Sequence, residues 1–578
     1  MSTNVEIAAR FTEMARALEL LGANRFRVIA HEKVARILEE LTDDVAELHS
    51  MEQLTAIDGI GDGSAKKIIE YLDTGRIAEH EELREQVPAG LFEVMEIPGL
   101  GPKTVRTLWE KAGITDLDTL RAKLDAGGLE DLPRMGKKTI DNIRAAIEFA
   151  AKGAERTRLG TALPAAEAIV ERLRSVSGVT QIEYAGSLRR GQETIGDIDI
   201  LAATSDPDAL RDAFTTHHDV DQVLAAGETK SSVRLDRGIQ CDLRIVEADA
   251  FGAALLYFTG SKQHNIVLRE RAIKRGWRLN EYALAESDAE DRATTGRIIA
   301  SKTEEEIYTA LDLPWIPPTL REDRGEFDRE IPTLISIDDI RAELHAHTVA
   351  SDGRMSIREL AQQAIDRGFH TIAITDHSRS SVQANGLSED RLRTHIDAVR
   401  TVAEELKKDI TLLAGSEVDI LIDGSLDYDD DLLAELDVVV ASPHASLRQD
   451  SKTATKRLLA AIRHPLVHIL GHPTGRLINR RQGLEPDMRQ LIAAAVEHDT
   501  ALEINANHYR LDLRDTHIRA AVEAGALLAI NTDAHSPIDF DQLRYGVLTA
   551  QRGWLTADRC LNAFPAAKLH RWLKAKRA

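Results

Sequence analysis

From Ile340 onward, short apolar runs alternate with stretches of helical periodicity. This alternation restricts the fold to an α/β domain with a parallel sheet, either open or closed into a barrel. A histidine or a carboxylate follows several of the apolar runs, as His377 follows the run that begins at Ile372. Because the carboxyl ends of parallel strands share one mouth, these side chains are expected to converge there. The predicted set is His345, His347, Asp352, His377, Glu417, His444, His472, Asp533 and His535.

So many imidazoles and carboxylates at one mouth are electrostatically unfavourable unless cations lie between them. About three divalent metal ions would satisfy this set, and Mn²⁺, Zn²⁺ or Fe²⁺ could occupy the site. A metal-bound hydroxide held there would be a nucleophile suited to hydrolysis. A lone His-x-His pair such as His345 and His347 is often accidental, but an ordered set of this size is not.

The ordered ligand set resembles that of the PHP (polymerase and histidinol phosphatase) superfamily, whose fold is a distorted (β/α)7 barrel. All metal positions of that superfamily are filled here, which implies an active site rather than a relic. Where a PHP domain follows a family X polymerase, the resemblance implies 3′–5′ exonuclease, 3′-phosphatase and abasic-site (AP) endonuclease activities.

Three aspartates upstream form a second candidate site. Asp197 and Asp199 are two residues apart, so they project from the same face of a predicted strand. A later run from Ile239 to Ile245 alternates cleanly and places Asp242 on its polar face. If the two strands are neighbours, the three carboxylates can hold two Mg²⁺ (or Mn²⁺) ions. Such a pair activates a 3′-hydroxyl and stabilises the leaving pyrophosphate.

A phosphate-binding turn precedes the aspartates. Gly186 and Ser187 offer backbone amides and a hydroxyl to phosphate oxygens, and Arg190 can add a bidentate contact. A bare Asp-x-Asp usually marks a solvated strand edge. The Gly-Ser turn with Asp-x-Asp and a third aspartate is specific for nucleotidyltransferases, so we predict an α+β nucleotidyltransferase palm.

With the segment after the palm included, the sequence resembles family X DNA polymerases, the DNA polymerase beta group, over roughly residues 5 to 320. That segment contains Tyr257-Phe258-Thr259-Gly260-Ser261 with Asn265 and Arg269. The resemblance implies that Tyr257 and Phe258 pack against the incoming sugar, with Gly260 beside them. It also implies that Asn265 contacts the base in the minor groove, that Arg269 touches the template side, and that the three aspartates are catalytic. A packing role for Tyr257 and Phe258 is the alternative.

The N-terminal region repeats a glycine-rich turn ahead of a helical stretch. The turns contain Gly59 and Gly61, then Gly99 and Gly101, with Lys103 close behind. Such turns point free amides at a phosphate, and they resemble helix-hairpin-helix motifs, which grip DNA through its phosphates without reading sequence. In that family, backbone carbonyls hold a monovalent cation, K⁺ or Na⁺; the matching carbonyls are Thr55, Ile57, Ile60, Met95, Ile97 and Leu100.

The same region resembles the small lyase domain of family X, which removes a 5′-deoxyribose phosphate through a Schiff base. Lys67 falls at the position of the family's nucleophile. A companion basic position is Gly63 here, and an aromatic position is Phe26, which lacks a hydroxyl. Lys67 is therefore either a nucleophile or a phosphate-binding surface lysine.

Composition sets outer limits on these interpretations. The net charge of −22 excludes a uniformly basic coat for nucleic acid, although local basic patches can still bind DNA. Two cysteines cannot form a disulfide framework, no apolar run is long enough for a membrane span, and residues 1–10 lack the pattern of a signal peptide. We expect a monomeric, cytoplasmic, nucleoid-associated protein that has no membrane partner.

The chain is expected to be multidomain. The predicted boundaries are a helical lyase-like domain at 1–85, helix-hairpin-helix fingers at 86–152, the palm at 153–250, a small dNTP-selection subdomain at 251–312, an extended proline-rich linker at 313–338, and the PHP domain at 339–578.

The favoured function is gap-filling DNA repair synthesis on gapped or primed DNA with dNTPs, together with processing of 3′ ends. One alternative is a nucleotidyltransferase acting on small molecules or RNA with a fused PHP phosphatase. Another is a DNA-end-binding scaffold whose sites are vestigial.

Overall fold

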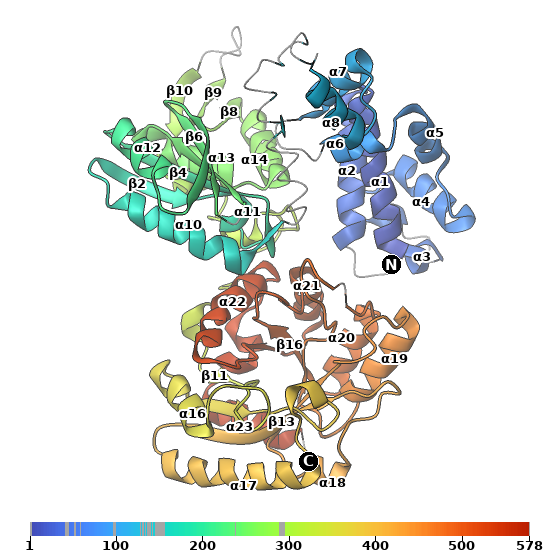
Figure 1. Cartoon of the computed structure of the whole chain (residues 1–578), viewed down its shortest axis with the longest axis vertical. Coiled ribbons are helices and arrows are strands. Elements are labelled where there is room, and N and C mark those ends of the chain that lie inside the picture. Colours follow the sequence, from blue (N-terminus) through green and yellow to red (C-terminus); the bar gives the residue numbers. More distant parts are fainter. Residues whose placement is uncertain are drawn as a thin grey trace. The chain divides into compact units, whose positions relative to one another are not determined.

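The computed structural model divides into two compact units, Met1–Glu155 and Arg156–Ala578, shown in Figure 1. It describes residues 3–40, 45–50, 54–57, 59–95, 100–127, 156–236, 238–287, 295–481 and 483–576, together with a few single residues between 129 and 144. Among these residues, no helix is long and apolar enough to cross a membrane.

The first unit is helical in its described part. One apolar cluster, which includes Phe11, Met14, Ile68 and Leu108, holds its helices together. Because the apolar residues recur at helical spacing, each helix has one apolar face, and that face packs into the shared cluster. The helices are α1 (Thr3–Leu20), α2 (Arg25–Glu40), α3 (Val45–Ser50), α4 (Asp62–Thr74), α5 (Ala78–Gln86), α6 (Gly90–Met95), α7 (Pro102–Ala112) and α8 (Leu117–Ala126).

The second unit begins with a five-stranded sheet in the order β2-β4-β7-β6-β5. The central strands β4 and β7 are parallel, and the other pairs are antiparallel. Helices α10 and α12 bury apolar residues such as Leu163 and Phe214 in the core of this domain. The elements are α10 (Leu159–Arg174), β2 (Val179–Tyr184), α11 (Gly186–Arg189), β4 (Asp197–Thr204), α12 (Pro207–Thr215), β5 (Val220–Ala226), β6 (Lys230–Leu235) and β7 (Gln240–Ile245), with a short pair β1 (Thr157–Arg158) and β3 (Thr194–Ile195).

A smaller subdomain follows, with helices beside a three-stranded antiparallel sheet. It comprises α13 (Phe251–Thr259), α14 (Lys262–Lys274), β8 (Trp277–Leu279), β9 (Leu284–Ser287), β10 (Thr295–Ala300) and α15 (Glu304–Ala310).

The segment 313–338, expected to be an extended linker, is irregular as its prolines predict, but it is packed. Ile316 and Leu320 are buried in the core of the small subdomain, with Trp554 from the C-terminal domain beside them. Arg321 is fully buried and forms a bidentate ion pair with Glu304. The apolar residues between the prolines, together with this ion pair, fix the segment in place.

The C-terminal domain is a seven-stranded parallel sheet whose strands follow one another in chain order. A bridge between Ala346 and Ala534 brings the first and last strands together, so the sheet is a nearly closed barrel. The strands are β11 (Ala342–Glu343), β12 (Thr371–Ile374), β13 (Thr411–Asp419), β14 (Val438–Ser442), β15 (Ile469–Leu470), β16 (Ala501–Asn505) and β17 (Leu528–Asn531). The helices are α16 (Ile357–Asp366), α17 (Glu389–Leu406), α18 (Asp430–Leu433), α19 (Ser451–Ile462), α20 (Met488–Glu497), α21 (Asp515–Ala524), α22 (Leu543–Arg552) and α23 (Ala566–Ala575).

Candidate active sites

The three aspartates of the palm lie on neighbouring strands. β4 and β7 pair in parallel with Asp199 opposite Asp242. Asp197 lies two residues before Asp199, on the same face of β4. Ile198 and Ile200 are fully buried on the other face. The strand pairing that would bring the carboxylates together is therefore present, as the alternating sequence pattern predicted.

The electrostatics of this face favour a bound cation. Burial and the negative charges of Asp197 and Asp242 raise the pKa of Asp199 to about 6. Burial and Asp242 also raise the pKa of Asp197. The Lys230 ammonium lies 2.6 Å from Asp242 Oδ2, and Gln240 Nε2 donates to Asp242 Oδ1. Crowded carboxylates of this kind match the oxygen donors that Mg²⁺ or Mn²⁺ takes. Lys230 and Gln240 were missed from the sequence, because neither belongs to the acidic motif.

The Gly-Ser turn lies directly beside these acids. Gly186 has a φ of 64° and begins α11; a Cβ at this position would lie 2.9 Å from Asp199 Oδ2. Only glycine fits both the left-handed backbone and this close approach. Ser187 is half-buried in the following turn, and Arg190 donates to the Thr259 carbonyl and to Glu322. The predicted triphosphate contacts are thus held at the edge of the acid cluster.

The predicted sugar- and base-contacting residues lie at the α13–α14 junction. Tyr257 is 39% exposed, and its ring meets Phe258 edge-on at 5.1 Å between centroids. Asn265 Nδ2 donates to the Tyr257 carbonyl, and Arg269 Nε donates to the Asn265 carbonyl. A Cβ at Gly260 would lie 3.3 Å from Arg190 Nη1, which connects this junction to the phosphate turn. Their roles toward nucleotide and template stay predictions.

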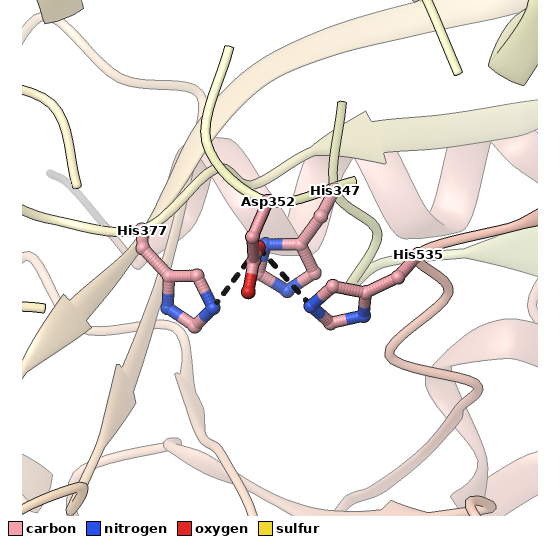
Figure 2. A group of neighbouring side chains, drawn as sticks. All are labelled: His347, Asp352, His377 and His535. Carbon is pink, nitrogen blue, oxygen red and sulfur yellow. Dashed lines mark ion pairs between the residues drawn. The ribbon is translucent and has the colours of Figure 1, made fainter. Parts of the chain in front are cut away.

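In the barrel, the nine predicted metal ligands converge on one mouth. Figure 2 shows His347, Asp352, His377 and His535 facing one another. Asp352 Oδ1 lies 3.2 Å from His535 Nε2 and 3.6 Å from His377 Nε2. Two further groups share members with the first: His345, His347, Glu417 and Asp533, and then His377, Glu417 and His444. His472 Nε2 lies 2.8 Å from Glu417 Oε1 and completes the set.

The donor atoms of this cluster match transition-metal ions. Six of these residues have buried nitrogen or oxygen atoms that lie near other ligand atoms but make no well-oriented hydrogen bond in the described structure: His345, His347, His377, Glu417, His472 and Asp533. Buried polar atoms without well-formed hydrogen bonds are costly, so their concentration at one place fits a metal-binding site. Imidazole and carboxylate donors suit Mn²⁺, Zn²⁺ or Fe²⁺.

Two acids behind the cluster orient its histidines. Glu503 Oε1 accepts from His345 Nδ1 at 2.8 Å, and Asp419 Oδ1 bonds His444 Nδ1. Such partners fix the tautomer and direction of a ligating imidazole. Sequence analysis missed both residues. The signals were present: Glu503 is a charged residue within a buried strand, and Asp419 follows Glu417 with strand spacing.

The carboxylates make metal binding pH-dependent. Against the effect of burial, Glu417 and Asp419 raise the pKa of His444 to about 10, and Asp352 and Asp533 raise the pKa of His535 to about 9. Without a metal ion, both imidazoles are therefore in their cationic, doubly protonated form at neutral pH. A metal ion that binds must displace one proton from each. For chelator-treated protein, we expect the apparent affinity for Zn²⁺ or Mn²⁺ to rise about tenfold per pH unit for each proton released, between pH 7 and 9. Calorimetric titration in buffers of different ionisation enthalpy checks this; a flat affinity with no proton release would contradict it.

In the helical unit, the structure describes the first glycine-rich turn apart from Asp58, and the second only in part. Gly59 has a φ of 91°, and Gly61 and Gly101 are the N-caps of α4 and α7 without a side-chain cap. A Cβ at Gly61 or Gly101 would meet nothing within 4 Å, and Lys103 is exposed. These helix starts are open to an incoming phosphate.

The structure describes most, but not all, of the residues whose carbonyls are predicted to hold a monovalent cation. Thr55 is exposed, Ile57 accepts from the Ile60 amide at 3.0 Å, Met95 ends α6, and Leu100 is buried. Ile97 and Gly99 lie outside the described residues. Cation binding by these carbonyls stays a prediction.

Lys67 is held by an acidic residue. Its Nζ lies 3.0 Å from Glu79 Oε2 and 3.3 Å from the Gly63 carbonyl. Arg27 and His31 also approach Glu79, and His31 is the largest cause of the low pKa of that carboxyl, followed by Arg27 and Lys67. A Schiff base forms on an unpaired amine, so Lys67 must leave Glu79 before it can attack a sugar.

Comparisons with known proteins agree with this architecture. Family models match a helix-hairpin-helix domain at residues 2–77, a SAM-like helix-hairpin-helix tandem at 92–148, a DNA polymerase beta thumb at 254–322 and a PHP domain at 343–507. The DNA polymerase/3′-5′ exonuclease PolX of Bacillus subtilis (strain 168) is 40% identical over 564 residues, which cover 96% of this chain and 97% of that protein.

Two relatives match separate parts of the chain. Rat DNA polymerase lambda is 27% identical over 343 residues, covering 55% of this chain and 56% of its own length. A probable phosphatase from Thermoanaerobacter sp. (strain X514) is 27% identical over 244 residues, covering 40% of this chain and 94% of its own. Fold and sites together define a polymerase beta-type nucleotidyltransferase joined to a PHP phosphoesterase. The chain belongs to the PolX family.

Proposed function

We propose that this protein fills short gaps in DNA and processes 3′ ends with a second, separate site. The observation that carries the proposal is the parallel pairing of Asp199 with Asp242 beside the Gly186 turn, in one chain with the nine-ligand mouth of the barrel. The enzyme is a family X DNA-directed DNA polymerase with a metal-dependent phosphoesterase. Its partners are gapped or primed DNA and dNTPs, and we place it in the cytoplasm at the nucleoid, as a monomer.

At the palm, Mg²⁺ or Mn²⁺ held by Asp197, Asp199 and Asp242 supplies activation of the 3′-hydroxyl and neutralisation of the triphosphate. The chain's own groups do the rest. Ser187 and Arg190 bind the triphosphate, and the Tyr257–Phe258 pair packs against the sugar and disfavours a ribose 2′-hydroxyl.

At the barrel, the nine ligands would hold metal ions, which would supply activation of a water molecule and charge neutralisation at the phosphorus. Glu503 and Asp419 hold His345 and His444 in their ligating tautomers. The proposed reactions are 3′–5′ exonucleolysis, 3′-dephosphorylation and cleavage at abasic sites.

The test is a 5′-phosphorylated one-nucleotide gap with a labelled primer, Mg²⁺ or Mn²⁺, and reactions with and without the complementary dNTP. We expect extension by one nucleotide with dNTP and shortening without it. A chain that neither extends nor shortens the primer would support the scaffold alternative. Transfer of a nucleotide to RNA or to a small molecule, but not to the primer, would support the alternative of a small-molecule or RNA nucleotidyltransferase.

A lyase reaction at Lys67 would require its amine to leave Glu79, with which it is paired. Borohydride trapping on DNA with a 5′-deoxyribose phosphate tests it. Wild-type protein is expected to trap little, and Glu79→Gln is expected to trap more; no trapping by either protein leaves Lys67 as a phosphate contact.

A further inference from the structure

The loop that carries Ser187 and Arg190, residues 186–192, rests on a helix of the barrel domain. We infer that Arg552, at the end of α22, is a positioning residue for nucleotide binding at the palm. The inference rests on the proposed polymerase function, and it assigns part of the dNTP site to the PHP domain.

The contacts run from the loop to α22 through one carboxylate. Glu322 Oε1 lies 3.0 Å from Arg190 Nε and 2.9 Å from Arg552 Nη1, and it accepts from Gln192 Nε2 at 2.6 Å. Arg552 Nη1 also donates to the main-chain carbonyl of Arg190 at 2.9 Å. The loop is therefore gripped at its main chain and at two side chains.

Backbone packing brings the loop against the same helix. Gly191 has a φ of 66°, and a Cβ there would lie 3.3 Å from Leu548 Cβ on α22. The left-handed backbone and the tight approach both favour glycine. The contact is thus a close fit between two surfaces rather than a pair of long side chains meeting in solvent.

Arg552 is itself fixed on the barrel side. Its side chain is 2% exposed, and Nη2 pairs with Asp515 Oδ2 at 2.7 Å. Arg324 pairs with the same carboxylate at 3.0 Å. Burial would raise the pKa of Glu322, but Arg552, Arg190 and Arg324 lower it to about 2, so the carboxylate stays charged at working pH.

This arrangement leaves Arg190 ready for a triphosphate. In the described structure its Nε and Nη1 are held by Glu322 and by the Thr259 carbonyl, which leaves Nη2 for a phosphate oxygen. Without Arg552, Glu322 would be buried with one cation fewer and would compete with the triphosphate for Arg190. The Arg190 carbonyl would also lose its donor, and the loop would lose its fixed position.

The experiment compares wild-type full-length protein with Arg552→Met, Arg552→Lys and a control, Arg329→Gln. Arg329 pairs with Glu523 of the barrel at 2.8 Å, but both side chains are about half exposed, so this pair is expected to contribute little. Binding of the complementary dNTP is measured on gapped DNA with a dideoxy-terminated primer, through 2-aminopurine fluorescence in the template. Single-nucleotide insertion then gives kcat and KM, and 3′–5′ shortening reports on the barrel.

For Arg552→Met, we expect the dNTP Kd and KM to rise about 10- to 100-fold, with kcat within about threefold of wild type and shortening unchanged. Arg552→Lys is expected to recover part of the affinity, and Arg329→Gln to match wild type. Unchanged dNTP affinity in both Arg552 variants would overturn the inference. If Arg552→Met lost both activities through misfolding, Arg552→Lys would decide: weaker dNTP binding with normal shortening supports the inference, and wild-type binding refutes it. A wild-type protein that bound no dNTP at all would instead refute the proposed polymerase.

Discussion

Replacing Asp197 and Asp199 together with alanine is expected to lower nucleotide insertion by about 10³-fold or more, with DNA affinity nearly unchanged. The two carboxylates lie on neighbouring strands with Asp242, and burial together with the charge of the neighbouring aspartates raises the pKa of both, which favours a bound cation. Without them, the palm keeps a single acid for the metal ions. The glycine-rich turns that are expected to bind DNA phosphates lie in the other structural unit, so that binding is not expected to depend on these acids.

A matched control is Asp221→Ala, which removes an exposed carboxylate from β5 at the edge of the same sheet. Insertion into a one-nucleotide gap gives the rate, and fluorescence anisotropy of labelled gapped DNA gives the affinity. The control should insert at the wild-type rate. Equal insertion by the double variant and the wild type would place the chemistry elsewhere and favour the scaffold alternative.

The second large effect is expected at the barrel. Glu417→Gln should lower 3′–5′ shortening by about 10³-fold or more and leave insertion intact. The Glu417 carboxylate approaches five imidazoles: it lies 3.4 Å from His345, 3.7 Å from His347, 2.9 Å from His377, 3.3 Å from His444 and 2.8 Å from His472. The amide keeps the shape but removes the charge that a group of metal ions needs.

His345→Ala should show the same separation, because it removes a ligand that Glu503 orients. His464→Gln serves as the control, since His464 follows α19 and pairs with Asp430 at the barrel surface. Metal content by mass spectrometry should fall in the first two variants and stay level in the third. Loss of insertion as well as shortening, in a variant that is still folded, would show that the two sites do not act independently.

Much of both sites could be predicted because their residues follow local sequence patterns. Strand alternation placed Asp242 on the polar face that meets Asp199, and the position of each histidine after an apolar run placed it at the barrel mouth. These features depend on periods of two residues or on the ends of strands, which a linear sequence displays.

Other features that were missed depend on partners far away in the chain. Glu322 and Arg552 meet across 230 positions, and Arg190 and Arg552 meet across 362. No local period encodes such pairs. The segment 313–338 misled for a related reason: its prolines predict irregular backbone, which is present, but its burial is decided by Glu304 and Trp554, which come from elements on either side.

The buried segment 313–338 limits where the polymerase and the phosphoesterase can be separated into two fragments. Arg321 and Arg189 both pair with the carboxylate of Glu304, the first residue of α15, so the start of the last helix of the polymerase half is held by a residue that follows that helix in the chain. A fragment trimmed at 312 would leave the buried Glu304 with Arg189 but without Arg321, and it would expose the apolar cluster to which Ile316 and Leu320 belong. Anyone who wants the polymerase alone should keep the chain through Leu334 and provide a substitute for Trp554. The same constraint would act on gene fusion or fission. A break placed only to spare the helices and strands would cut the packed segment 313–338, which joins the two domains.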